Sequence, residues 1–136
     1  MTRHALVVGG GRIGTALVQQ LVAEGARVTI VERDADRAEE LRPPAGCRVV
    51  HGDGADPEVL EAAGVRTVDV VAAVTGDDPG NLVVCALARL AFGVPRTVSR
   101  VEDPAHLWLF TPAVGVDLVV DRAALLTAAI LADVDA

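Results

Sequence analysis

The stretch "HALVVGGGRIGTALVQQLVAEG", residues 4 to 25, decides the fold because it places a glycine-rich turn between a strand and a helix. Residues 4 to 9 contain a run of apolar side chains ending in two valines, which is typical of a buried strand. After the turn, apolar side chains recur at helical spacing, at Ile13, Leu17, Leu21 and Val22. Gly25 then ends the predicted helix, where glycine commonly takes the left-handed conformation.

The same alternation of strand and helix patterns continues along the chain. Further strands are predicted at residues 27 to 32, 47 to 52, 68 to 75, 96 to 101 and 116 to 121, and helices at 34 to 42, 56 to 64, 82 to 93, 103 to 110 and about 122 to 133. Parallel strands joined by right-handed helical crossovers give an α/β fold, a Rossmann-type doubly wound six-stranded parallel sheet in the order 3-2-1-4-5-6. We expect a single domain over residues 1 to 136, with its ligand beyond the carboxyl ends of strands 1 and 4.

Composition excludes several classes of protein. The 136 residues carry a formal net charge of −7, which disfavours binding to the phosphates of nucleic acid. No apolar run approaches the roughly 20 residues that cross a bilayer, so we expect a cytoplasmic chain without direct membrane insertion. All 12 basic residues are arginine, and tyrosine is absent. The chain therefore lacks a Schiff-base lysine, a Walker A lysine and a tyrosine–lysine pair for carbonyl reduction.

The glycine-rich turn is suited to hold a pyrophosphate. Gly9, Gly11 and Gly14 fit the pattern GxGxxG between a strand and a helix, where they allow a tight turn, close approach of an anion and close packing of helix on strand. Glu32 stands at the end of the second strand, 23 positions after Gly9. A carboxylate there accepts hydrogen bonds from both ribose hydroxyls and favours NAD or an adenine nucleotide over NADP, a preference that adjacent Arg33 weakens.

Further positions are candidates for the same cleft, and three of them have a structural alternative. Asp53 is placed to accept an adenine amino hydrogen or to serve as a turn residue between two glycines, and Thr75, which follows Val74, is placed to contact ribose or phosphate. Arg12 either binds phosphate oxygens or is a solvated residue of the first helical turn. Arg100 either points into the cleft or forms a surface ion pair.

No set of residues suggests catalysis. The three histidines have no metal-ligand spacing. Asp77, Asp78 and Asn81 could hold a divalent cation, but capping of the following helix is the favoured interpretation. We therefore expect a protein that binds a nucleotide without transforming it and is not an enzyme. The alternatives are the cofactor domain of an NAD-dependent oxidoreductase without its catalytic partner, and an interaction module that binds no nucleotide.

Several blocks of the sequence resemble one known family. "VVGGGRIGTALVQQL", "VTIVERD", "GDGADPEVLEAAGV" and "VDVVAAVTGDDPGNLVVCALA", together with the stretch from Val94 to Val120, are similar to the regulator-of-potassium-conductance N-terminal domain, also called RCK-N or TrkA-N. This is the nucleotide-binding module of Trk and Ktr potassium-uptake regulatory subunits and of gated potassium channels. The resemblance covers about 120 residues, and it implies a switch operated by NAD(H) or by ATP/ADP rather than a dehydrogenase.

The resemblance also implies the residues of the binding site. The family's phosphate loop falls on Gly9, Gly10, Gly11, Arg12, Ile13 and Gly14, its ribose acid on Glu32, its adenine contact on Asp53 with Gly54, and its remaining cleft residues on Val74, Thr75 and Arg100. Glutamate replaces the aspartate often found at the ribose position, so the sugar is expected to sit differently. Similarity at Arg12 to triphosphate-sensing members implies a bridge to a terminal phosphate or to a neighbouring subunit.

The implied partners are a membrane potassium transporter or channel subunit and further copies of the chain, in a homodimer or a higher ring. Trp108, Phe110 and the terminal helix offer apolar surface for such a dimer, with a plain core helix as the alternative. The terminal helix would then be a dimerisation or crossover helix. We expect the family's C-terminal ligand-binding subdomain to lie outside these 136 residues.

Overall fold

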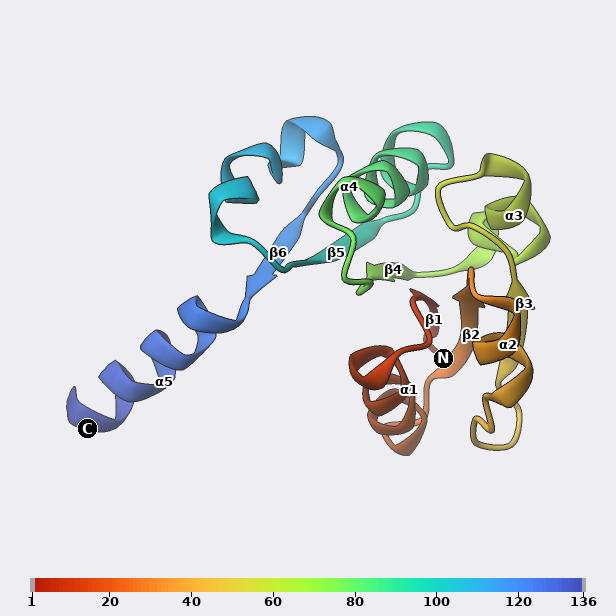
Figure 1. Ribbon diagram of the computed structural model, residues 1–136, viewed down its shortest axis with the longest axis horizontal. Coiled ribbons are helices and arrows are strands. Elements are labelled where there is room, and N and C mark those ends of the chain that lie inside the picture. The colour runs from red at the N-terminus through yellow and green to blue at the C-terminus, as the bar shows by residue number, and fades with distance from the viewer. Residues whose placement is uncertain (1, 136) are drawn as a thin grey trace.

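A computed structural model, which describes residues 2 to 135, contains a six-stranded parallel sheet in the order β3-β2-β1-β4-β5-β6, as predicted (Figure 1). The strands are β1 (His4–Val8), β2 (Arg27–Glu32), β3 (Arg48–His51), β4 (Val70–Ala73), β5 (Arg96–Val101) and β6 (Leu118–Asp121). The helices are α1 (Arg12–Ala23), α2 (Ala35–Glu40), α3 (Pro57–Ala62), α4 (Asp78–Ala86) and α5 (Arg122–Asp135). Shorter helical turns cover Val65–Thr67, Leu87–Ala91, Pro104–Leu109 and Pro112–Val114.

Two hydrophobic cores cover the two faces of the sheet. Ala5 and Val7 of β1 are buried against Val18 of α1, whereas Leu6 of the same strand is buried in the cluster that contains Val84 of α4. Alternate residues of a strand point to opposite faces, so one strand supplies both cores. The central strands are apolar on both sides, as expected of a parallel sheet that is covered by helices.

The residues predicted to start and end helices do so at α1 and α3. Gly25, with φ +88°, follows the end of α1, and Gly64, with φ +81°, follows the end of α3. The Asp56 carboxylate accepts a hydrogen bond of 2.9 Å from the Glu58 amide, so it caps α3, and Pro57 occupies the first turn. At Gly25 and Gly64 the chain leaves the helix and turns back toward the sheet.

Several predicted boundaries and one predicted helix type differ from the structure. Helix α4 begins at Asp78 rather than at residue 82, because Pro79 starts a helix as readily as Pro57 does. Strand β4 is limited to Val70–Ala73, and the segment predicted as a helix at 103 to 110 forms a 3-10 helix over Pro104–Leu109. The earlier start of α4 places Asp78 and Asn81 inside a helix.

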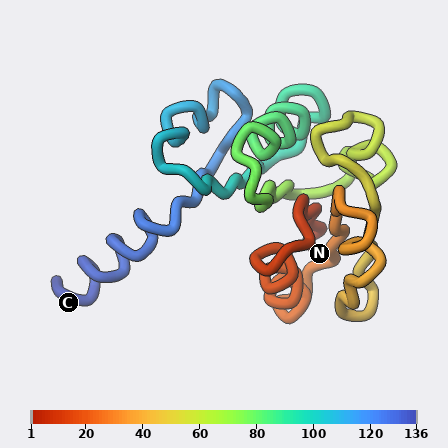
Figure 2. Tube along the Cα trace, in the orientation of Figure 1, coloured from red at the N-terminus to blue at the C-terminus, as the bar shows by residue number. Residues whose placement is uncertain are grey.

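Helix α5 leaves the domain at the edge strand β6 and carries the C-terminus away from the sheet (Figures 1 and 2). All of its described residues are exposed. The expectation of exposed apolar surface near residue 110 is half right, because the Trp108 side chain is 74% exposed whereas Phe110 is buried in the core. Within residues 2 to 135, no helix has the length and hydropathy to cross a bilayer.

Candidate functional site

A cleft of about 410 Å³ lies at the carboxyl ends of the central strands, where the sheet changes winding direction. A volume of this size is typical of small-molecule sites. The residues that line it include every predicted site residue except Gly10 and Gly14, namely Gly9, Gly11, Arg12, Ile13, Glu32, Asp53, Gly54, Val74, Thr75 and Arg100. The structure therefore brings together residues that are up to 91 positions apart in the chain.

The glycine-rich turn has the geometry that its spacing predicts. Gly9 has φ +117°, a backbone conformation that favours glycine. A Cβ at Gly14 would lie 1.7 Å from the Gly9 carbonyl oxygen, so α1 packs against the turn at a distance that only glycine permits. At Gly11 the nearest atom to such a Cβ is Nη1 of Arg37, 3.9 Å away. Gly14 therefore serves packing, and Gly11 keeps the cleft open.

The N-terminus of α1 opens into this cleft. Gly11 is its N-cap and forms no side-chain capping bond, and its first turn contains no acidic residue. Backbone N–H groups in a first turn have no partner within the helix, and the helix dipole adds positive potential there. Arg12 and Ile13 are exposed and line the cleft, and Arg12 forms no ion pair within the described part of the chain. An anion would satisfy these amides and offset the cation at this helix end.

Glu32 is buried and held mainly by backbone amides. Its Oε1 accepts a hydrogen bond of 2.8 Å from the Gly10 amide, and its Oε2 accepts one of 2.7 Å from the Asp34 amide. Nη1 of Arg37 lies 3.5 Å from Oε1. Since a carboxylate offers about four acceptor positions, the side chain is fixed in direction and still has capacity for ribose hydroxyls.

Asp53 is a turn residue that also lines the cleft. Its Oδ1 accepts a hydrogen bond of 2.9 Å from the Ala55 amide, so it is a turn residue, and its exposed side chain also lines the cleft. A Cβ at neighbouring Gly54 would lie 2.5 Å from Cγ1 of Val8. Glycine at position 54 therefore lets the turn after β3 approach the end of β1.

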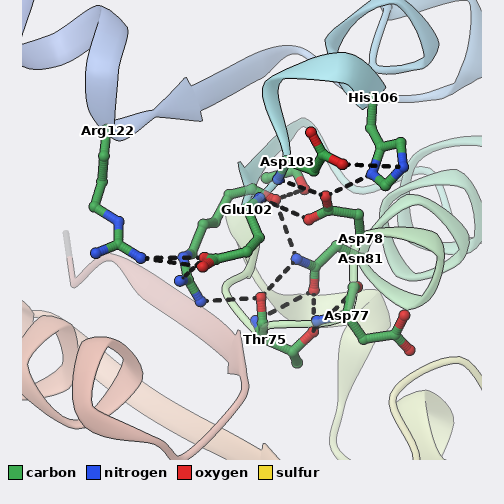
Figure 3. A network of polar contacts seen from close by, with 10 residues as sticks. Thr75, Asp77, Asp78, Asn81, Glu102, Asp103, His106 and Arg122 are labelled. Atoms are coloured by element: carbon green, nitrogen blue, oxygen red, sulfur yellow. Dashed lines mark hydrogen bonds and ion pairs between the residues drawn. The ribbon is translucent and has the colours of Figure 1, made fainter.

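Asn81 joins the ends of β4 and β5. Its buried side chain donates 3.0 Å to the Thr75 carbonyl and 3.1 Å to the Arg100 carbonyl, and its Oδ1 accepts 2.6 Å from the Thr75 hydroxyl (Figure 3). Arg100 also donates through Nη1 to the Thr75 carbonyl, at 3.3 Å. Thus the position of Thr75 and Arg100 in the cleft depends on one buried amide.

The favoured capping role of Asp77, Asp78 and Asn81 is wrong. Asp77 is the N-cap of α4 but its side chain forms no capping bond, and Asp78 and Asn81 lie within the helix. The buried Asp78 carboxylate instead accepts hydrogen bonds from the amides of Glu102 (2.7 Å) and Asp103 (2.9 Å). The side chains of Asp78 and Asn81 hold neighbouring loops rather than capping α4.

His106 also contacts the Asp78 carboxylate, since its Nδ1 lies 2.8 Å from Oδ2 of Asp78 (Figure 3). Burial raises the pKa of Asp78, but hydrogen bonds from the two amides and from His106 outweigh it and leave the pKa below its usual value. The hydrogen bond to Asp78 raises the pKa of His106. No group of three or more metal-ligating side chains is found among residues 2 to 135.

Two residues at this cleft, Arg122 and Glu102, were not predicted from the sequence. Arg122, the first residue of α5, lines the cleft, and its Nη2 lies 3.1 Å from Oε2 of Glu102. Arg100 also forms an ion pair with Glu102, so both alternatives considered for Arg100 occur together. The available signal was topological, since Arg122 directly follows β6 and the carboxyl ends of parallel strands meet at one edge.

The cleft is cationic although the chain is acidic. The charged residues that line it are five arginines and three acids, namely Arg12, Arg33, Arg37, Arg100, Arg122, Glu32, Asp53 and Asp77. The chain as a whole has a net charge of −7. Positive charge is therefore concentrated where the α1 N-terminus also attracts anions.

The sheet topology, the glycine turn and the cleft at the switch point define a Rossmann-type domain. The family model of the TrkA-N domain matches residues 5–122, and the chain belongs to this family. The resemblance drawn from the sequence blocks is thereby confirmed.

Named relatives agree with this assignment. The chain is 39% identical over 125 residues to the "Trk system potassium uptake protein TrkA" of Mycobacterium tuberculosis (strain ATCC 25618 / H37Rv), a match that covers 91% of this chain and 56% of that protein. A similar protein of Pyrococcus abyssi, named a TrkA homolog, is 36% identical over 79% of this chain and 47% of its own length. The chain thus spans about half the length of these relatives.

Solved structures share the fold. The TrkA-N domain of the inner membrane protein ybaL from Escherichia coli superposes with a TM-score of 0.82 at 24% identity, covering 96% of both chains. The GsuK channel bound to NAD gives a TM-score of 0.73 at 26% identity, over 88% of this chain and 21% of that one. GsuK bound to ADP gives 0.75 at 26% identity, over 89% and 31%.

Proposed function

We propose that this chain is a nucleotide-sensing regulatory domain that binds NAD(H) or ATP/ADP and regulates a membrane potassium transporter or channel. The observation that carries the proposal is the cationic cleft in which Glu32 faces the uncapped N-terminus of α1. The Glu32 carboxylate suits ribose hydroxyls, and the N-terminus of α1 beside it suits phosphates. Support comes from relatives named as potassium uptake proteins and from the GsuK structures with NAD and ADP.

In this proposal the nucleotide is a signal and not a substrate. The described residues that line the cleft include no histidine, cysteine or serine, and the chain has no lysine or tyrosine. The lining side chains that could transfer a proton or attack as nucleophiles are Glu32, Asp53, Thr75 and Asp77. Glu32, Asp53 and Thr75 are engaged in hydrogen bonds within the chain, which suits a structural or binding role. Steady consumption of NADH with small carbonyl compounds would contradict this part of the proposal.

Regulation would follow from binding one arrangement of subunits better than another. The chain would lie in the cytoplasm and act on the membrane through its partner. A second copy is the expected partner of α5, whose exposed apolar residues are Leu125, Leu126, Ile130, Leu131 and Val134. Such an unpaired apolar helix face is typical of a protein interface. Sedimentation equilibrium is expected to show a dimer or larger ring, and Leu126→Glu is expected to shift it toward monomer.

Thermal-shift titration with NAD, NADH, ATP and ADP tests the binding function. A ligand that binds only the folded state raises the melting temperature with concentration, so the ranking of the four identifies the signal. Gly11→Val is expected to keep the unliganded melting temperature, because the space beyond Gly11 is open, and to abolish the shift. Glu32→Ala is expected to remove the shift through loss of the ribose acceptor. The proposal fails if none of the four ligands shifts the wild-type chain at millimolar concentration.

A further inference from the structure

The carboxylate of Glu102 forms ion pairs with two of the five arginines that line the cleft. It forms an ion pair with Arg100, and Nη2 of Arg122 lies 3.1 Å from its Oε2 and 3.4 Å from its Oε1 (Figure 3). Both arginines line the same cleft as the glycine turn. A carboxylate placed between two guanidinium groups has the charge and the acceptor geometry of a phosphate oxygen pair.

The main chain of Glu102 is fixed while its side chain is free to turn. Its amide and that of Asp103 are both held by the buried Asp78 carboxylate, at 2.7 and 2.9 Å. The Glu102 side chain is 46% exposed. A rotation about its side-chain bonds would move the carboxylate into solvent without disturbing the loop.

The two arginines differ in how firmly they are held. Arg100 has only 16% of its side chain exposed, donates to the Thr75 carbonyl, and has a buried Nε without a hydrogen-bond partner in the described structure. Arg122 is 68% exposed, and its side-chain hydrogen bonds within residues 2 to 135 go to Glu102 alone. Arg100 is therefore a fixed cation, whereas Arg122 is oriented by Glu102.

We propose that Glu102 is a built-in competitor for the anionic part of the ligand and that it lowers the selectivity for phosphorylated over unphosphorylated ligands. This proposal rests on the proposed function. When a phosphate enters, Glu102 turns to solvent, and Arg100 and Arg122 transfer their hydrogen bonds to the phosphate oxygens. Binding must then displace an existing ion pair, which lowers affinity for phosphate and has no effect on the adenosine part.

Isothermal titration calorimetry with ADP and with adenosine tests the proposal. Glu102→Gln keeps the size of the side chain and the backbone bonds to Asp78 but removes the competing charge. We expect it to strengthen ADP binding by about fivefold at low salt and to leave adenosine binding within about twofold. Arg122→Gln alone is expected to change ADP affinity little, because Arg122 is already neutralised, but to cancel much of the gain when combined with Glu102→Gln.

Two results would overturn the competitor role. One is unchanged or weaker ADP binding by Glu102→Gln at an unchanged melting temperature, and the other is an equal gain for adenosine. If Glu102→Gln melts early, Glu102→Asp serves instead, because its shorter side chain reaches Arg122 less well and is expected to strengthen ADP binding in the same direction. Failure of the proposed function gives a different result, since the wild-type chain would then bind neither ADP nor NAD.

Discussion

The two ends of the cleft are built in different ways. At the end formed by β1 and β2, a glycine turn, a helix terminus and backbone amides position Glu32, all within residues 9 to 34. At the end formed by β4, β5 and β6, side chains of Asn81 and Glu102 hold Thr75, Arg100 and Arg122, and Asp78 holds the Glu102 amide. These groups span residues 75 to 122. The first end depends on local backbone geometry and is called the backbone end. The second depends on a network of side chains and is called the network end.

The first prediction tests the backbone end, where the largest effect is expected. Gly14→Ala places a Cβ against the Gly9 carbonyl oxygen, so α1 must move away from the turn. We expect a loss of about 3 kcal/mol in the free energy of unfolding, measured by urea denaturation. Gly11→Ala is the matched control and is expected to unfold like the wild type. Equal stability of Gly14→Ala would contradict the close packing of this turn.

Removing one side chain of the network end is expected to lower the free energy of unfolding by less than Gly14→Ala does. Asn81→Ala deletes four side-chain hydrogen bonds that link Thr75 to Arg100 and leaves buried polar groups unpaired. We expect a cost of about 2 kcal/mol in urea denaturation, against about 1 kcal/mol for Thr75→Val. Similar costs for both variants would show that Asn81 is not the centre of the network.

The network end is also expected to respond to pH in the neutral range. The pKa of His106 is raised above 6.5 in the folded chain, so its bond to Asp78 contributes full stability below about pH 6.5, and this contribution is lost as pH rises through the folded value. The difference in melting temperature between the wild type and His106→Gln should therefore be largest near pH 6. The difference should shrink by about pH 8.

The lowered pKa of Asp78 affects stability at acidic pH instead. Its contribution is present above the usual value of 3.8 and is lost as pH falls through the lowered folded value. Above about pH 5 the Asp78 carboxylate is charged in the folded and unfolded chain, so its ionisation adds no pH dependence to the difference between wild type and His106→Gln. A melting-temperature difference between wild type and His106→Gln that stays constant from about pH 6 to 8 would contradict the contact.

The smallest effect is expected at the ion pair of the backbone end. Arg37 is 54% exposed and lies 3.5 Å from Glu32, whose carboxylate already accepts two shorter bonds from amides. Arg37→Gln is expected to change the free energy of unfolding by less than about 0.5 kcal/mol in urea denaturation. A larger loss would mean that a side chain, and not the backbone, fixes Glu32.

This difference explains what could be predicted from the sequence. Strand order, the glycine turn and Glu32 followed from local patterns, because a turn and the two elements beside it are encoded together. The role of Asp78 was mistaken and Glu102 and Arg122 were missed, because their partners are set by the register of β4, β5 and β6. An aspartate beside a helix start looks the same whether it caps that helix or holds a distant loop.

The central claim is that a nucleotide binds in the cleft lined by the glycine turn and Glu32. Titration of the isotopically labelled chain with ADP, followed by two-dimensional amide NMR, tests it most directly, because each backbone amide reports on its own surroundings. The account predicts the largest shifts at the amides of Gly9 to Gly14, at Asp53 and Gly54, and at Thr75, with none of them in Gly11→Val. Shifts confined to α5, or no shifts at millimolar ADP and NAD, would contradict it.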